Sequence, residues 1–159
     1  MQLEVSSSVH RDIRNLGIGD LPALLQIYSH LHRKDEPLPG PDVVASVWSE
    51  FLSSPHFLCF GGYEREFLVS SCTLAIIPNL TRGCRPCGLI ENVVTHSDHR
   101  NKGWGKALLA HALRAAWERR CHKVELTTGR NDEAIVRFYE AAGFDSHDRR
   151  AFVARSNAA

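Results

Sequence analysis

A turn that contains two closely spaced glycines separates an expected strand from an expected helix, and it constrains the fold of this chain more than any other feature. Residues 89–94 are mainly apolar and β-branched, which predicts a buried strand, although Glu91 and Asn92 interrupt the apolar run. Residues 100–105 (RNKGWG) follow, and apolar side chains then recur at helical spacing over residues 106–117. We therefore expect a strand, a tight basic turn and a helix in succession.

Phosphate is the ligand that such a turn suits best. Gly103 and Gly105 can adopt unusual backbone dihedral angles, and their missing side chains let an anion approach the backbone amides. The first N–H groups of the following helix have no partners within the helix and lie at the positive end of its dipole. Arg100 and Lys102 add positive charge at the same place.

Two well-known phosphate motifs do not match this turn. A Walker loop needs a Ser or Thr after its Gly-Lys pair, but Gly105 and Lys106 are followed by Ala107. A dinucleotide fingerprint needs a glycine where this chain has Leu108. The remaining pattern, R-x-x-G-x-G, predicts a phosphate site, and the alternative is an ordinary strand-to-helix turn whose glycines serve geometry alone.

A second stretch, residues 131–144 (NDEAIVRFYEAAGF), carries further signals at Ala134, Phe138, Tyr139, Gly143 and Phe144. Together with the glycine turn, this stretch resembles the GCN5-related N-acetyltransferase (GNAT) family. The resemblance is strong in the second half of the chain and extends to the first half only in the order of elements. It implies the acyl-CoA N-acyltransferase fold and acetyl-coenzyme A bound on the R-x-x-G-x-G turn.

The order of elements predicts a mixed α/β fold, with a central mixed, mostly antiparallel sheet and helices on both faces. Asp20 and Asn131 are expected to cap the helices that follow them. We expect a single N-acetyltransferase domain over residues 1–159. The expected strands span residues 9–16, 56–63, 66–78, 88–96 and 123–128, the helices span 21–31, 42–52, 106–117 and 131–143, and 144–155 supplies one or two short strands.

Composition excludes several classes of protein. The 159 residues are 43% hydrophobic and 23% charged, with a net charge of +1, which is ordinary for a globular domain and opposes a nucleic-acid partner. Residues 1–8 lack the features of a signal peptide, and no apolar run is long enough to span a membrane. The five cysteines are expected to be free thiols in a cytoplasmic protein, and the pair Cys84 and Cys87 lacks partners for a metal site.

The family resemblance assigns chemistry to two side chains. Tyr139 is the candidate general acid that protonates the leaving thiolate, and the alternative is a core tyrosine. Glu91, expected to be partly buried, is the candidate base, acting directly or through water. The alternatives are that it only binds the acceptor ammonium or that it pairs with a neighbour such as Arg82 or Arg85.

The resemblance also implies how the coenzyme is held. The strand at residues 93–95 is expected to diverge from its parallel neighbour, so that its free backbone groups pair with the pantetheine arm. Asn131 is expected to contact the coenzyme, although a capping role explains it almost as well. The expected coenzyme-binding residues are Val93, Val94, Thr95, Arg100, Asn101, Lys102, Gly103, Trp104, Gly105, Lys106, Asn131 and Phe138.

The acceptor is expected to be the primary amine of a small molecule, such as an amino sugar, an amino acid or an amine metabolite. Arg82 and Arg85, in the turn before the Glu91 strand, would bind a phosphate or carboxylate on such an acceptor. Two alternatives are a protein or peptide N-acetyltransferase and a non-catalytic module that senses acyl-CoA. No metal is expected, and a homodimer is one candidate assembly.

Overall fold

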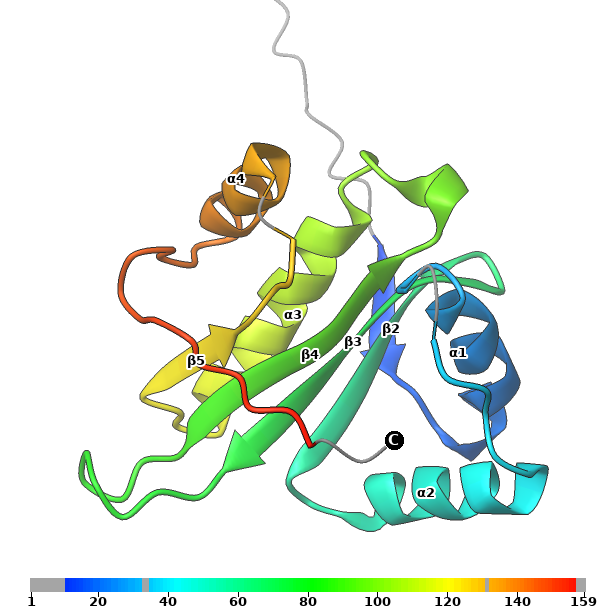
Figure 1. Cartoon of the computed structure of the whole chain (residues 1–159), viewed down its shortest axis with the longest axis horizontal. Helices are drawn as coiled ribbons and strands as arrows, with labels where there is room; N and C mark the ends of the chain where they lie inside the picture. The colour runs from blue at the N-terminus through cyan, green and yellow to red at the C-terminus, as the bar shows by residue number, and fades with distance from the viewer. Residues whose placement is uncertain (1–10, 33–34, 131, 157–159) are drawn as a thin grey trace, which may run out of the picture.

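Five strands form one sheet in the order β1-β2-β3-β4-β5, and helices cover both of its faces (Figure 1). The computed structural model describes residues 11–32, 35–130 and 132–156. The strands are β1 (Asp12–Asn15), β2 (Phe57–Glu64), β3 (Phe67–Ile77), β4 (Cys87–Thr95) and β5 (Lys123–Leu126). The helices are α1 (Leu21–Tyr28), α2 (Pro41–Ser53), α3 (Trp104–Glu118) and α4 (Glu133–Ala141), with short 3₁₀ turns η1 (Ile18–Asp20) and η2 (Ser97–His99).

The first four strands are antiparallel neighbours, whereas β5 runs parallel to β4. Hairpin turns join β2 to β3 and β3 to β4, while α3 crosses over between β4 and β5, and such a crossover sets the two strands parallel. The predicted mixed, mostly antiparallel sheet is therefore confirmed.

Each face of the sheet has its own hydrophobic core, because neighbouring side chains on a strand point to opposite faces. On β2, Cys59 packs with residues of α1 and α2, while Phe60 packs with residues of α3. Phe138 and Tyr139 of α4 lie against the α3 core. The expectation of helices on both faces is confirmed.

A β-bulge in the middle of β4 changes which face its side chains occupy. Glu91 pairs with Thr73 and Val94 pairs with Ser71, so β4 contains one more residue than β3 between these pairs. Asn92 is the residue with left-handed backbone, at φ +54°. As a result Ile90 belongs to the α3 core and Val94 to the α1 core, although an unbroken strand would place both on one face.

Two sequence predictions about helix caps need correction, and one about the start of a strand is not tested. The side chain of Asp20 makes no capping bond to α1, because its carboxylate accepts from the Gly17 amide. Asp132 caps α4 by accepting from the Ile135 amide at 3.2 Å, whereas Asn131 and the expected strand start at Val9 lie outside the described residues.

No strand forms over the described residues 145–156, although one or two were expected there. Phe152 and Val153 are 88% and 69% exposed, so their apolar side chains find no surface to pack against, and side-chain packing is what stabilises a strand. Gly143, with φ +99°, ends α4 as predicted.

The Tyr63 hydroxyl connects the segment before α1 to the sheet. It donates a hydrogen bond to Asp20 at 2.8 Å, and its ring is buried in the core beneath α1 and α2. Burial, followed by the contact with Asp20, raises the pKa of Tyr63 from 10.0 to about 12. Because the folded-state pKa lies above the unfolded value, the stability contributed by the neutral hydroxyl is complete below pH 10 and is lost as pH rises towards 12.

Tyr63→Phe removes this hydrogen bond while keeping the ring. We expect the variant to lower the free energy of unfolding at pH 7 by about 1 kcal/mol, the usual size for one hydrogen bond. The difference from the unmodified protein should shrink between pH 10 and pH 12, as measured by urea denaturation at a series of pH values. A difference that stays constant over that range would contradict this explanation.

Candidate active site

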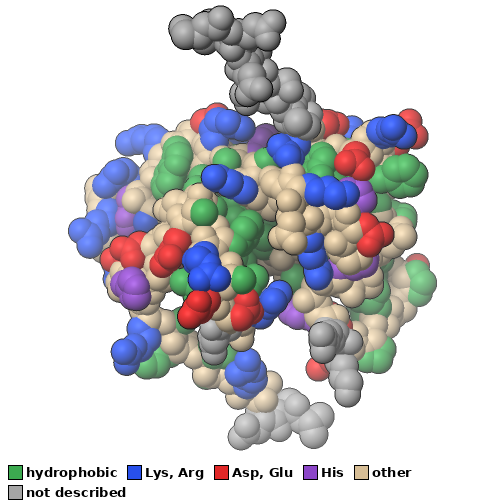
Figure 2. Space-filling model, turned by 90° about the horizontal axis from the view of Figure 1, so that it is seen from above, with side chains coloured by type: hydrophobic (Ala, Val, Ile, Leu, Met, Phe, Trp, Pro, Cys, Tyr) green, Lys and Arg blue, Asp and Glu red, His purple; other side chains and the backbone are tan. Residues whose placement is uncertain are grey.

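A cavity of about 860 Å³ lies where β4 and β5 separate, between the first turns of α3 and α4 and the segment that follows α1. In the view from above, Lys and Arg side chains surround a central area of hydrophobic side chains (Figure 2). The residues of the sequence-based prediction that line the cavity are Glu91, Val93, Val94, Thr95, Arg100, Asn101, Gly103, Trp104, Gly105, Lys106, Phe138 and Tyr139.

The cavity exists because β5 is shorter than β4. Pairing between the two strands ends at Ile90 and Leu126, while β4 continues to Thr95 along β3. Residues 91–95 therefore present a strand edge that pairs with no other strand on the β5 side, within the part of the chain that the structure describes. This is the divergence that the family resemblance implied, and a peptide-like chain with its own amides can pair with such an edge.

The glycine turn exposes backbone amides to the same cavity. Gly103 has φ +80° and precedes α3, and the first hydrogen bond of the helix runs from the Ala107 amide to the Gly103 carbonyl at 3.1 Å. The amides of residues 104–106 therefore have no acceptor within the helix. Their position at the positive end of the α3 dipole suits an anion.

Gly105 has a packing role that the sequence did not reveal. A Cβ atom at this position would lie 2.9 Å from Cζ of Phe138, which is closer than van der Waals contact allows. The glycine therefore lets α4 approach the first turn of α3, which supports the geometric explanation of the turn and leaves its amides open to an anion.

The basic residues of the turn occupy different places. Arg100 lines the cavity while its guanidinium donates to the carbonyls of Thr95 at 3.2 Å and His30 at 3.3 Å, which ties the end of β4 to the segment after α1. Lys106 also lines the cavity, on the first turn of α3. Lys102 does not belong to the lining, and its carbonyl accepts from the Arg11 guanidinium.

Tyr139 and Glu91 line the same cavity. Tyr139 is half-buried, with its ring edge-to-face against Phe138 and Phe144 at centroid distances of 5.0 and 6.3 Å. Burial is the main cause that raises the pKa of the Tyr139 hydroxyl, so the phenol stays protonated at neutral pH and can donate a proton. Glu91 is exposed, which corrects the expectation of a partly buried carboxylate.

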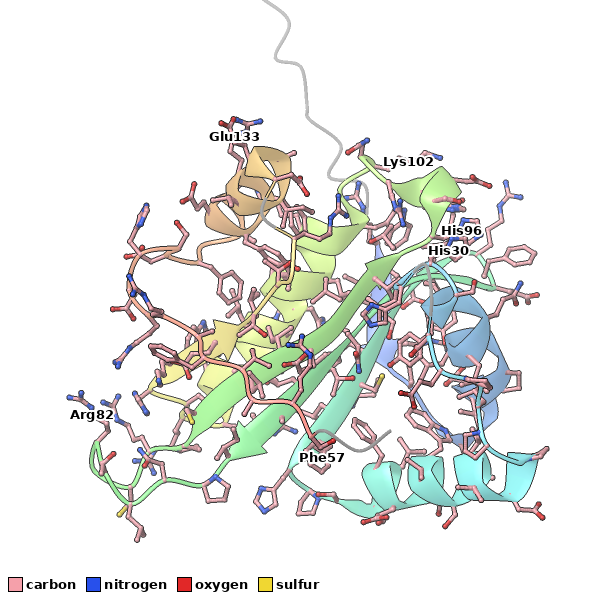
Figure 3. All side chains as sticks on the ribbon, in the orientation of Figure 1. His30, Phe57, Arg82, His96, Lys102 and Glu133 are labelled. Atoms are coloured by element: carbon pink, nitrogen blue, oxygen red, sulfur yellow. The ribbon has the colours of Figure 1, made fainter. Side chains whose placement is uncertain are left out.

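Three predicted site residues are not brought into the cavity. Arg82 and Arg85 lie in the turn at the opposite end of β4, where Arg85 donates to the Arg82 carbonyl at 3.1 Å (Figure 3). Lys102 lies at the upper end in the same view, away from Arg82. Asn131 lies outside the described residues, so its expected contact with the coenzyme stays a prediction.

The loop from β5 to α4 supplies cavity residues that the sequence analysis missed, namely Thr127, Thr128, Gly129, Arg130 and Asp132. A signal for them was present, since this polar run directly follows a parallel strand, and ligands bind outside the carboxyl ends of such strands. His30 and His32, after α1, were also missed, and no local pattern marks them.

The described residues show neither a helix that is long and apolar enough to cross a membrane nor a cluster of three side chains suited to hold a metal ion.

Comparisons with known proteins agree with this geometry. The family model described as "Acetyltransferase (GNAT) family" matches residues 21–144. The glucosamine 6-phosphate N-acetyltransferase of Trypanosoma brucei brucei is 32% identical over 144 residues, which cover 89% of this chain and 94% of the relative. A solved putative acetyltransferase from Agrobacterium tumefaciens str. C58 superimposes with a TM-score of 0.85 at 39% identity, covering 91% of this chain and 99% of that one.

A solved acetyltransferase of Trypanosoma brucei has a TM-score of 0.76 at 29% identity and covers 92% of this chain and 100% of that one. The glucosamine-6-phosphate N-acetyltransferase of Arabidopsis thaliana, at 20% identity and a TM-score of 0.80, shares the fold. Because the family model covers more than half of the chain, the chain belongs to the acetyltransferase (GNAT) family, as an acetyl-CoA-dependent N-acetyltransferase.

Proposed function

We propose that this protein transfers the acetyl group of acetyl-CoA directly to the primary amine of an amino sugar, with a hexosamine phosphate as the first candidate. The observation that carries the proposal is that one cavity joins the free amides of α3, the open edge of β4, Glu91 and Tyr139. The names of two relatives support an amino sugar phosphate as the acceptor. The Trypanosoma protein is a glucosamine 6-phosphate N-acetyltransferase, and so is a Schizosaccharomyces pombe protein that is 29% identical over 94 residues.

The residues of the cavity fit acetyl-CoA. The amides of residues 104–106, with the cationic side chains of Arg100 and Lys106, would hold the diphosphate. The open edge at residues 93–95 would pair with the pantetheine amides. When bound, acetyl-CoA supplies an activated acetyl group on a thioester.

Glu91 and Tyr139 would act on the acceptor and on the leaving group. The exposed carboxylate of Glu91 attracts the ammonium form of the acceptor, and it takes up the proton released when the amine becomes a nucleophile, directly or through water. The protonated hydroxyl of Tyr139 delivers a proton to the departing thiolate. The names of the two relatives favour a small acceptor over a protein.

We further infer one domain over residues 1–159, a cytoplasmic location and a homodimeric assembly. The single sheet with a core on each face supports the one domain. The five free cysteines suit a reducing compartment. Sedimentation analysis of the purified protein tests the dimer.

Acetyl-CoA should bind the protein without any acceptor. We expect the melting temperature to rise with acetyl-CoA concentration, because a ligand that binds only the folded state stabilises it. Thiol release should then be detected when glucosamine 6-phosphate is added. An unchanged melting temperature at about millimolar acetyl-CoA, well above the binding constants usual for such ligands, would contradict the proposed coenzyme site.

Tyr139→Phe tests the general acid. We expect turnover to fall by about a hundredfold, the usual range for losing a general acid, while the affinity for acetyl-CoA stays within about twofold. Tyr63→Phe is a matched control, because it makes the same chemical change at a tyrosine outside the cavity and should retain the original turnover. Equal turnover in the two variants would remove Tyr139 from the mechanism.

A further inference from the structure

Arg130 is a cation in the cavity to which the proposed function gives no task. Of the other strong cations in the lining, Arg100 is bonded to two backbone carbonyls and Lys106 lies on α3 beside the free amides. Arg130 comes from the opposite wall, the loop between β5 and α4. It is therefore separate from the group of amides and cations that suits the coenzyme diphosphate.

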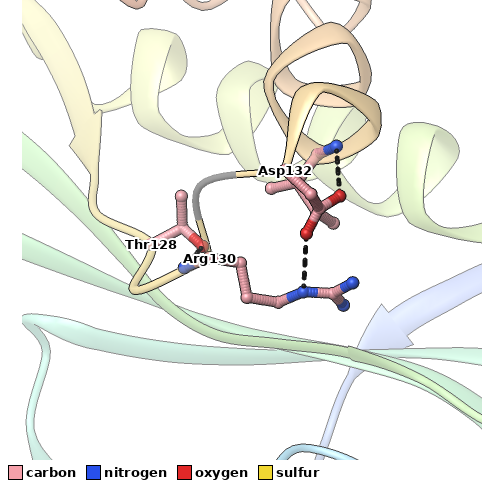
Figure 4. Close-up of polar contacts among 4 residues, drawn as sticks. Thr128, Arg130 and Asp132 are labelled. Atoms are coloured by element: carbon pink, nitrogen blue, oxygen red, sulfur yellow. Dashed lines mark hydrogen bonds and ion pairs between the residues drawn. The ribbon is translucent and has the colours of Figure 1, made fainter.

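The loop holds Arg130 in place from both sides (Figure 4). Its backbone amide donates to the hydroxyl of Thr128 at 3.2 Å, and its Nε donates to one carboxylate oxygen of Asp132, also at 3.2 Å. The other carboxylate oxygen of Asp132 caps α4 through the Ile135 amide. The backbone of Arg130 is thus tied to the loop after β5, and its side chain is tied to the residue that caps α4.

The end of the guanidinium is available for a ligand. Only Nε is engaged by Asp132, and no described residue accepts a hydrogen bond from Nη1 or Nη2 of Arg130. The side chains of this ion pair are 68% and 48% exposed, and exposed pairs contribute little to stability. Binding an anion at the two Nη atoms would therefore cost little, and a guanidinium can bind an oxyanion through two parallel hydrogen bonds.

Two opposite charges, those of Arg130 and Glu91, line the same cavity as Tyr139. Burial is the main cause that raises the pKa of the Tyr139 hydroxyl, while the positive charge of Arg130 lowers it and the negative charge of Glu91 raises it. A primary amine arrives as an ammonium ion, which Glu91 attracts and Arg130 repels. The repulsion is offset when the acceptor carries an anionic group that pairs with Arg130.

We propose that Arg130 is a specificity-determining residue, whose guanidinium binds the phosphate of an amino sugar phosphate while Glu91 faces the amine. This assignment rests on the proposed function and adds to it the residue that recognises the phosphate of the first candidate acceptor. It also replaces Arg82 and Arg85, which were expected to bind such a group but lie outside the cavity.

The experiment compares two acceptors that differ only in the phosphate, glucosamine 6-phosphate and glucosamine, in the unmodified enzyme and in Arg130→Gln. We expect Arg130→Gln to lower kcat/KM for glucosamine 6-phosphate by about ten- to a hundredfold, mainly through KM, because a charge-assisted bidentate contact is lost. For glucosamine kcat/KM should stay unchanged or rise, because the repulsion between Arg130 and the ammonium group is removed, and the KM for acetyl-CoA should not change. Arg130→Lys keeps the charge but not the two parallel donor groups. Its kcat/KM for glucosamine 6-phosphate should therefore lie between the values of the unmodified enzyme and of Arg130→Gln.

Arg137→Gln is the matched control. Arg137 is also 68% exposed and forms a single ion pair, with Glu133 on the outside of α4, but it does not line the cavity. We expect it to leave both acceptors unaffected. Equal losses for both acceptors in Arg130→Gln would overturn the assignment, and so would a raised KM for acetyl-CoA, which would place Arg130 with the coenzyme.

Calorimetric binding of glucosamine 6-phosphate to the enzyme in the presence of coenzyme A separates this assignment from the proposed function. Binding that weakens about tenfold or more in Arg130→Gln, without any turnover in the unmodified enzyme, would support Arg130 and refute the proposed acetylation. Equal binding by the two proteins, or no binding by either, would overturn the assignment of Arg130 whatever the turnover.

Discussion

The early end of the pairing between β4 and β5 is the constraint on which the rest of this site depends. Beyond Ile90 and Leu126 the two strands diverge, and among the residues that the structure describes, the backbone of β4 at residues 91–95 has a strand partner only on the β3 side. Backbone groups without partners are costly when they are buried, so such an edge persists only where water or a ligand reaches it. The cavity is thus a consequence of the topology, and the side chains that line it are those that this divergence brings to its walls.

Two local features set the shape of the cavity. The bulge at Asn92 moves the side chains that follow it to the other face of the sheet, so that Val94 joins the α1 core. The close approach of Gly105 and Phe138 joins the two helices that form the opposite walls, because only a glycine leaves room for this ring. Tyr139 is the next residue along α4, so the same contact that packs Phe138 also positions the candidate acid.

Agreement between sequence and structure was best where a signal is local. The five strands, the helix after the glycine turn and the end of α4 at Gly143 each follow from a pattern within a few residues. Agreement failed for Arg82 and Arg85, which are close to Glu91 in sequence but lie at the other end of β4. A strand advances about 3.3 Å per residue, so a separation of a few residues along it already removes a side chain from a site.

The sequence by itself determined the order of elements, the free amides of the α3 turn and the aromatic pair on α4, because backbone preference and apolar periodicity act over short distances along the chain. Only the tertiary structure decided which charged groups share the cavity. Glu91 and Arg130 come from β4 and from the loop after β5, and they face one cavity because the register of the sheet and the end of β5 place them there. The proximity of these charged groups depends on contacts between segments distant in sequence, which no local pattern encodes.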